Sequence, residues 1–235
     1  TKETLLAIQE GKTKFTDNRI YQIAMTCKIP VIAAMQGHGI GAGWALGMFA
    51  DFVLFSEESR YFSPYMNYGF TPGAGATFIF PEKIGHDLSR ETLMTAQEYA
   101  GKELKERGLF MSVLPKEQVS SAALDLARQI ANRSRSSLVA FKHQQTQHLY
   151  APLEETYKRE LAMHEKTFVG QFDTLKQIND NFYQGNDSKT EVSQLALPTS
   201  IQDKVHSAVA VPSLGKDNLT YVTTSLRQLL AQELH

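Results

Sequence analysis

The sequence is poor in the features that define several large classes of protein. It holds one cysteine, Cys27, among 235 residues, so no disulfide can form within the chain and no cysteine-cluster metal site is possible. Such low cysteine usage is typical of a reducing compartment, and we expect a cytoplasmic location. The 24 Lys and Arg residues are matched by 25 Asp and Glu residues, with no dense basic block. The charge pattern of a general nucleic-acid binder is therefore missing.

Long apolar runs and targeting segments are missing from the sequence as well. No stretch approaches the roughly 18 consecutive apolar residues that a membrane span needs, so no membrane partner is expected. The beginning, TKETLLAIQEGK, lacks the apolar core of a signal peptide. It also lacks an initiating Met, which predicts a fragment or an excised domain. An apolar fraction of 42% and a charged fraction of 21% are those of an ordinary globular protein.

Glycine, in contrast, is concentrated in one short stretch, MQGHGIGAGWALGMFADF, at residues 35–52. On either side stand continuous apolar segments, 30–35 and 51–56, of the kind that forms strands buried on both faces. Residues 44–50 between them have a helical pattern. The order strand, glycine turn, short helix and strand predicts a βαβ unit with two parallel strands.

Helical patterns dominate the rest of the chain, apart from a short strand predicted at Tyr61 and Phe62. The apolar spacing in residues 1–27 predicts two helices, with a break between them at Gly11. Further helices are predicted at 88–96, 101–107, 119–134, 153–168 and 172–183. A solvated helix face is expected from Glu154, Glu155, Lys158, Arg159 and Glu160. Together these patterns predict an α/β fold with a helical C-terminal part.

Composition divides the chain into three parts. Residues 1–185 carry the periodic apolar patterns of one folded domain. Residues 186–218 are rich in Ser, Thr, Asp and Pro and show no sustained period, which predicts a linker. Residues 219–235 predict an amphipathic helix that has no core of its own. We therefore expect residues 187–235 to be dispensable for chemistry.

The glycine stretch also predicts a binding site. A helix whose first turn is Gly41-Ala42-Gly43 presents unpaired backbone N–H groups and the positive end of its dipole. Such a turn can bind a phosphate or stabilise an oxyanion that develops on a carbonyl. The spacing differs from G-x-G-x-x-G, and no G-x-x-x-x-G-K-[ST] occurs, which argues against nucleotides. A third interpretation, in which the glycines only let a helix pack tightly on a sheet, stays open.

Several motifs, in order, resemble the crotonase (enoyl-CoA hydratase/isomerase) superfamily. They are IPVIAAMQGHGIGAGWALGMFADF, YGFTPGAGAT, an apolar helix and GLFMSVLP, and they cover roughly residues 1–183. The resemblance implies a crotonase-like ββα spiral whose N-terminal part is absent from this chain, a helical C-terminal trimerisation region and acyl thioester substrates. It also implies two backbone N–H groups that hold the thioester oxygen. The second donor falls at Ala42, beside Gly41, and the first would precede Thr1.

The sequence departs from the hydratases of this superfamily at two positions. Those enzymes use two glutamates to position and activate water, and the corresponding residues here are Ala45 and Tyr65. A methyl group and a phenol cannot share the proton transfers of two carboxylates, so water addition is not expected. Tyr65 is instead expected to wall the substrate pocket.

With QGHGIGAG, MNYGFTPG and MHEKTF, the chain is similar to the crotonase-like decarboxylases of polyketide β-branching cassettes, of the bacillaene and curacin type. The resemblance implies that 3-methylglutaconyl-acyl carrier protein loses CO₂ and becomes 3-methylcrotonyl-acyl carrier protein. The phosphopantetheine of the carrier would hold the substrate, with no other cofactor. Losing CO₂ needs no base, because the carboxylate supplies its own electrons and only the enolate needs stabilising. Expected partners are the acyl carrier protein, a homotrimer and other domains of a polyketide synthase.

The resemblance also assigns further site residues. His164, in MHEKTF, is placed on a C-terminal helix that reaches the active site and is expected to donate the final proton. His38 could line the channel of the carrier arm or pack beneath the glycine turn. Curacin-type members carry a Tyr and a Lys where this chain has Thr4 and Ile8, so the chain is nearer the bacillaene type, and Thr4 is expected to contact the substrate.

Two other functions stay open. One is the partner dehydratase that makes the 3-methylglutaconyl group, against which the lack of a carboxylate at Ala45 and Tyr65 argues. The other is a non-catalytic scaffold that binds an acyl thioester without turnover. A metal site is not expected, because His143 and His148 are five residues apart and do not share a helix face.

Overall fold

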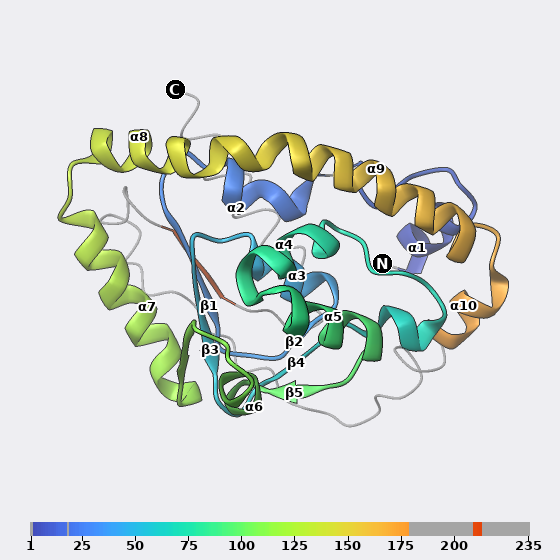
Figure 1. Ribbon diagram of the computed structural model, residues 1–235, viewed down its shortest axis with the longest axis horizontal. Coiled ribbons are helices and arrows are strands. Elements are labelled where there is room, and N and C mark those ends of the chain that lie inside the picture. The colour runs from blue at the N-terminus through green and yellow to red at the C-terminus, as the bar shows by residue number, and fades with distance from the viewer. Residues whose placement is uncertain (1, 18, 179–208, 213–235) are drawn as a thin grey trace.

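The computed structural model of the protein describes residues 2–17, 19–178 and 209–212 (Figure 1). The strands are β1 (Val31–Met35), β2 (Gly39–Ile40), β3 (Phe52–Ser56), β4 (Arg60–Phe62), β5 (Tyr99–Ala100), β6 (Ser112–Leu114) and β7 (Val209–Pro212). The α-helices are α1 (Lys2–Gln9), α2 (Ile23–Thr26), α3 (Ala42–Met48), α4 (Ala76–Ile84), α5 (His86–Thr95), α6 (Gly101–Glu106), α7 (Lys116–Ala131), α8 (Arg135–Thr146), α9 (Tyr150–Thr167) and α10 (Phe172–Ile178). Short 3-10 helices are Ile20–Gln22, Pro64–Tyr68 and Gln147–Leu149.

The strands form two small sheets. One has the order β6-β3-β1-β7 with every pair parallel, and the other has the order β2-β4-β5. Successive strands alternate between the sheets before each helix, as β1, β2, α3 and then β3, β4, α4. The predicted parallel pair is confirmed, with Ile32 beside Phe52, and so are the ββα turns that the resemblance implied. The predicted βαβ unit contains one more strand, β2, because a two-residue strand leaves no period in the sequence.

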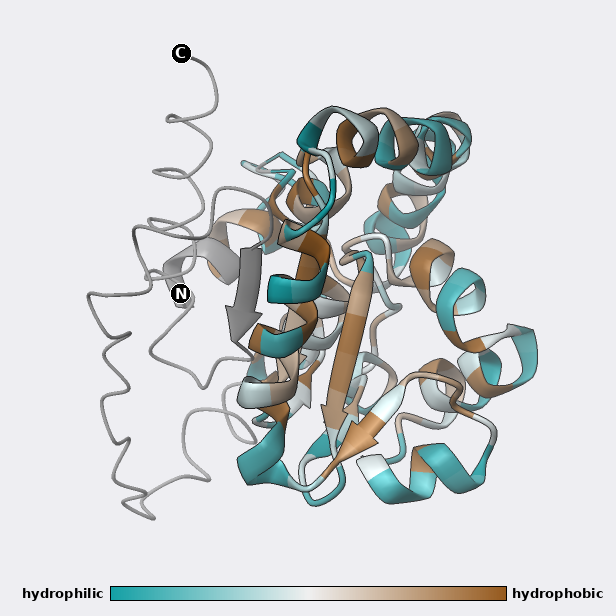
Figure 2. Cartoon of the chain, turned by 90° about the vertical axis from the view of Figure 1, so that its left-hand side faces the viewer, coloured by the Kyte–Doolittle hydropathy of each residue, from teal (hydrophilic) through white to brown (hydrophobic). Residues whose placement is uncertain are grey.

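Both faces of the larger sheet are buried. Helix α7 covers one face, where Ile32 and Leu54 meet Val119 and Ala123. The alternate residues of the same strands belong to the main core with Trp44. Figure 2 shows largely brown strands between helices in which brown and teal stretches alternate, as expected of helices with one apolar face. Burial on both faces explains why β1 and β3 are continuously apolar in the sequence.

The helices agree with the predicted segments in most places. Residues 88–96, 101–107, 119–134 and 153–168 correspond to α5, α6, α7 and α9. The apolar helix expected after the PGAGAT turn is two helices, α4 and α5, that meet at Gly85. Helix α8 was not expected, because its sequence, RSSLVAFKHQQT, carries little apolar period. None of the helices that the structure describes is both long and apolar enough to cross a membrane.

Helices α8 and α9 run almost end to end along one edge of the molecule (Figure 1). One buried side chain fastens α8 to the rest of the fold. The Lys142 side chain is 4% exposed, and its ammonium donates to the carbonyls of Ala24 and Ile29, each at 2.8 Å, and to Oδ2 of Asp51 at 2.7 Å. Since Asp51 directly precedes β3, this lysine ties α8 to the segments that enter the two central strands.

Strand β7 lies within the segment predicted to be a linker. Val209–Pro212 pairs in parallel with β1, with Ala210 beside Ile32. The linker prediction is wrong for these four residues, because pairing with a distant strand is invisible to composition. The rest of 186–218, the predicted helix 219–235 and the end of the predicted helix 172–183 lie outside the described residues.

Candidate active site

The glycine turn joins β2 to α3 and presents the start of that helix. Gly41 precedes the helix with φ 53° and ψ −118°, a conformation that glycine adopts readily and other residues rarely. A Cβ at this position would also lie 3.1 Å from the Tyr65 hydroxyl oxygen. Ala42 is the first residue of α3, so its N–H has no acceptor within the helix. A Cβ on Gly43 would meet no described atom within 4 Å, so this helix start borders open space.

Other glycines of the stretch serve packing. A Cβ at Gly47 would lie 2.6 Å from the sulfur of Met35, and one at Gly39 would lie 2.7 Å from the ring of Tyr61. The packing interpretation therefore holds for these two positions. Gly41 is the position where the backbone conformation itself requires glycine.

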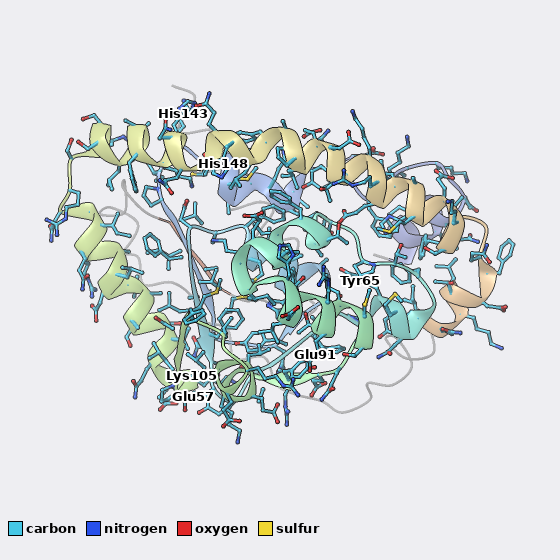
Figure 3. All side chains as sticks on the ribbon, in the orientation of Figure 1. Glu57, Tyr65, Glu91, Lys105, His143 and His148 are labelled. Atoms are coloured by element: carbon cyan, nitrogen blue, oxygen red, sulfur yellow. The ribbon has the colours of Figure 1, made fainter. Side chains whose placement is uncertain are left out.

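Tyr65 stands against this turn, in the 3-10 helix Pro64–Tyr68. Its ring packs on Phe70 with centroids 5.2 Å apart. Burial raises the pKa of the Tyr65 phenol well above its usual value, and the nearby Tyr21 and Glu160 add to this effect. The hydroxyl is therefore neutral over the physiological range. Figure 3 shows Tyr65 on the side of the molecule where Figure 1 places α1 and α10.

His164 lies on α9 and is 4% exposed. Its Nε2 is 3.1 Å from the carbonyl oxygen of Thr71. Because a carbonyl only accepts, Nε2 carries the proton of the neutral ring and donates it. Burial lowers the pKa of His164, while the Thr71 and Pro72 carbonyls act in the opposite direction. The ring is therefore neutral at pH 7, and its Nδ1 is buried with no hydrogen-bond partner among the described residues.

Aromatic rings surround His164. Phe15 lies 4.7 Å from it, centroid to centroid, and Phe70 lies 6.4 Å from it. Phe168 packs on both of these phenylalanines. On another side the backbone comes very close, since a Cβ on Gly73 would be 2.3 Å from Cε1 of His164. The imidazole thus lies among aromatic rings, in space that any side chain at position 73 would overlap.

The structure brings four predicted site residues to one region. A Cβ on Gly41 would meet the Tyr65 hydroxyl, and Tyr65 packs on Phe70, which neighbours His164. The helix start at Ala42 and the imidazole are thus linked through two aromatic side chains. Ile8 of α1 belongs to the same apolar cluster. Thr4 is in α1 as well, but its side chain lies outside the described part of the structure.

The remaining predicted histidines lie elsewhere. His38 is exposed before β2, and its Nδ1 accepts a hydrogen bond from the Arg60 N–H at 2.9 Å. This hydrogen bond joins the segment before β2 to β4. The role of His38 in the channel of the carrier arm stays a prediction. His143 and His148 lie at the α8 end of the long helical edge, away from Tyr65 (Figure 3). Within the described ranges, no group of three or more His, Cys, Asp or Glu side chains could hold a metal ion.

Sequence reasoning missed a buried carboxylate on α9. Glu160, which was expected on a solvated face, is 1% exposed and accepts hydrogen bonds from the start of α4. Glu155 and Arg159, in contrast, pair on the exposed face of the helix, as expected of a solvated face. The spacing offered one signal, because Glu160 precedes His164 by four residues and must share its helix face. Phe15, Phe70 and Gly73 carried no such signal.

The fold and this site define a class of protein. Residues 2–179 match the enoyl-CoA hydratase/isomerase family, and the chain belongs to that family. The resemblance to the crotonase superfamily is thereby confirmed.

Individual relatives indicate the type of enzyme more specifically than the family does. The chain is 52% identical over 172 residues to the bacillaene synthase decarboxylase PksI of Bacillus subtilis (strain 168), a match that covers 72% of this chain and 68% of that protein. A structure from a dehydratase/decarboxylase enzyme couple involved in polyketide β-branching superposes with a TM-score of 0.75 at 47% identity, over 79% of this chain and 74% of that one. The ECH2 decarboxylase domain of CurF from Lyngbya majuscula superposes with a TM-score of 0.71 at 40% identity, over 77% and 74%. The similarity to the β-branching decarboxylases is confirmed as well.

Proposed function

We propose that the protein decarboxylates 3-methylglutaconyl-acyl carrier protein and yields 3-methylcrotonyl-acyl carrier protein in polyketide β-branching. One observation carries the proposal: a buried imidazole with an unpartnered Nδ1 lies among aromatic rings, and Phe70 and Tyr65 connect it to an oxyanion-type helix start. The two positions at which hydratases of the superfamily carry glutamate hold Ala45 and Tyr65. The relative that is 52% identical is a decarboxylase, which supports a decarboxylation.

The thioester carbonyl is held at the start of α3. The Ala42 N–H donates to the carbonyl oxygen. Negative charge grows on that oxygen as the enolate forms, and the positive end of the helix favours it. A donor of this kind contributes about 10²–10³ in rate.

Loss of CO₂ follows from this arrangement. The bond between the γ carbon and the carboxyl group breaks, CO₂ departs, and the electron pair spreads through the dienolate to the thioester oxygen. The rings of Phe15 and Phe70 replace water around the carboxylate. An apolar surrounding disfavours the localised charge of the carboxylate more than the dispersed charge of the dienolate.

His164 completes the reaction by returning one proton. A substrate carboxylate beside Nδ1 raises the pKa of the imidazole, because an opposite charge favours the charged form. Binding therefore takes up a proton from solvent, after which Nε2–H still donates to Thr71 and Nδ1–H faces the substrate. When CO₂ has left, Nδ1 gives its proton to the γ carbon, which produces the 3-methylcrotonyl group.

The same site is poorly suited to water addition. Ala45 is fully buried within α3 and has no group that could move a proton. The Tyr65 phenol, with its raised pKa, is a poor base. Hydration would need a group to deprotonate and orient water, a contribution of typically about 10²–10⁴.

One experiment separates decarboxylation from hydration. The complete enzyme is incubated with 3-methylglutaconyl-carrier protein and, separately, with a crotonyl thioester, and the acyl masses are followed. We expect loss of CO₂ from the first substrate and no detectable gain of water by the second. Hydration without decarboxylation would favour the dehydratase, and binding without turnover would favour a scaffold.

The enzyme also has expected partners. The acyl carrier protein delivers the substrate on its phosphopantetheine, with His38 and Gly41 along the arm and Thr4 at the substrate, and no other cofactor takes part. The C-terminal helices form a homotrimer, and other domains of a polyketide synthase flank the enzyme in the cytoplasm. Analytical ultracentrifugation of the complete protein tests the trimer directly.

A further inference from the structure

Glu160 has an unusual environment for a carboxylate. Its side chain is 1% exposed, and both oxygens accept hydrogen bonds from the beginning of α4. Oε2 accepts from the Gly75 N–H at 2.8 Å, while Oε1 accepts from the Thr77 N–H at 3.1 Å and from the Thr77 hydroxyl at 2.6 Å. Burial raises the pKa of Glu160, and these three donors oppose that effect. The Glu160 carboxylate thus caps the N-terminus of α4, a helix from a different part of the chain.

The segment between Thr71 and Thr77, here called the strap, is fastened to α9 at both ends. At one end, Nε2 of His164 donates to the Thr71 carbonyl, and Thr167 contacts the N–H and the hydroxyl of Thr71. At the other end stands Glu160. Between these points Gly73 lies directly against the His164 ring. The strap and α9 therefore contact each other along two turns of helix.

The backbone conformation of the strap requires contacts that stabilise it. Ala74, at its centre, is buried with φ 61°, a left-handed conformation that non-glycine residues rarely adopt. Gly75 follows with φ 77°. A backbone held in these conformations persists only when its surroundings determine it. At the C-terminal end of the strap, the hydrogen bonds of Glu160 hold Gly75 and Thr77 to α9.

We propose that Glu160 is a positioning residue for His164. By holding Gly75 and Thr77, it sets the strap so that the Thr71 carbonyl meets Nε2 and Nδ1 remains directed to the substrate. This inference rests on the proposed role of His164 as proton donor. Glu160 itself does not touch the reacting atoms.

Glu160→Gln tests this inference because it keeps the size of the side chain and changes its hydrogen bonding. The new NH₂ group is a donor and would face an N–H donor of Gly75 or Thr77, so at least one contact is lost. Glu155→Gln is the matched control, since it makes the same change on the exposed face of α9. Both variants are made in the complete enzyme.

The first readout needs no substrate. Long-range ¹H–¹⁵N NMR of histidine-labelled enzyme reports which ring nitrogen of His164 carries the proton and how the ring titrates. We expect the Nε2–H form in the wild type and in Glu155→Gln. In Glu160→Gln we expect a mixture of both tautomers and an altered titration.

The second readout is turnover. Since a small displacement of a catalytic group costs up to about 10²-fold, we expect Glu160→Gln to lower kcat by about 10- to 100-fold, with KM little changed. More of the product should also carry its proton at the α carbon. A folded Glu160→Gln variant with the tautomer, titration and product ratio of the wild type overturns the inference.

Two further outcomes are distinguishable. Altered His164 signals in an enzyme that shows no decarboxylation in any form support the positioning role and refute the proposed function. If Glu160→Gln does not fold, Thr77→Val removes only the hydroxyl donor and keeps the shape of the side chain. Thr77→Val should shift the His164 titration in the same direction by a smaller amount, and unchanged signals in it would overturn the inference.

Discussion

Gly73 and His164 lie so close that a Cβ on the glycine would be 2.3 Å from Cε1 of the imidazole. The ring is also held by Thr71, so Gly73→Ala must displace the ring or the strap. We expect this variant to lose about as much activity as His164→Ala, with a small loss of stability.

A double-mutant cycle tests this mechanism. If Gly73→Ala acts through the imidazole alone, the double variant Gly73→Ala/His164→Ala should be no slower than His164→Ala. An additive loss of rate would show that Gly73 acts by another route.

His164→Ala should keep thioester binding and slow turnover by about 10²–10⁴, because it removes a proton donor and leaves the helix start at Ala42 intact. Protonation should also become less selective between the α and γ carbons. Product analysis by NMR and steady-state kinetics measure both effects. His143→Ala, on the exposed side of α8, is the control. An unchanged rate and isomer ratio in His164→Ala would exclude the assignment.

Ala42→Pro removes the proposed oxyanion donor while the helix can still form, since proline is favoured at the first position of a helix. The expected loss in kcat is about 10²–10³. Ala42→Gly keeps the N–H and should retain nearly full activity. Equal activity of the proline and glycine variants would contradict a role for this N–H.

The stability of the protein should depend on pH through His164. Burial lowers the pKa of this residue in the folded state, so the unfolded chain binds the proton first as the pH falls. Stability is therefore complete above the ordinary histidine pKa of about 6.5 and decreases below it, by at most about 1.4 kcal/mol per pH unit. Denaturant unfolding at pH 7.5 and 5.5 should show a smaller decrease for His164→Gln than for the wild type. Identical decreases would contradict the buried neutral ring.

Lys142→Met should destabilise the fold strongly. It removes the donor shared by Ala24, Ile29 and Asp51 and leaves a partly buried carboxylate without its cation. The expected loss is about 3 kcal/mol in urea unfolding. Lys158→Met, at an exposed position of α9, should change stability by less than about 0.5 kcal/mol.

Local patterns in the sequence determined much of the fold. The strands β1 and β3 are buried on both faces, so their continuous apolar runs revealed them. The turn at Gly41 was visible because a positive φ requires glycine, and the motifs around it identified the family. His164 became a candidate site residue through its motif, since no local pattern marks a histidine as buried.

The tertiary structure decided the features that depend on distant partners. Glu160 reads as part of a charged helix face until α4, more than eighty residues away, covers it and supplies three donors. Lys142 likewise reads as a surface lysine until three separate segments converge on its ammonium group. The short strands β2 and β7 exist because other strands pair with them. Periodicity records only which face of an element is buried, whereas the surroundings of a polar group depend on which remote segments fold against it.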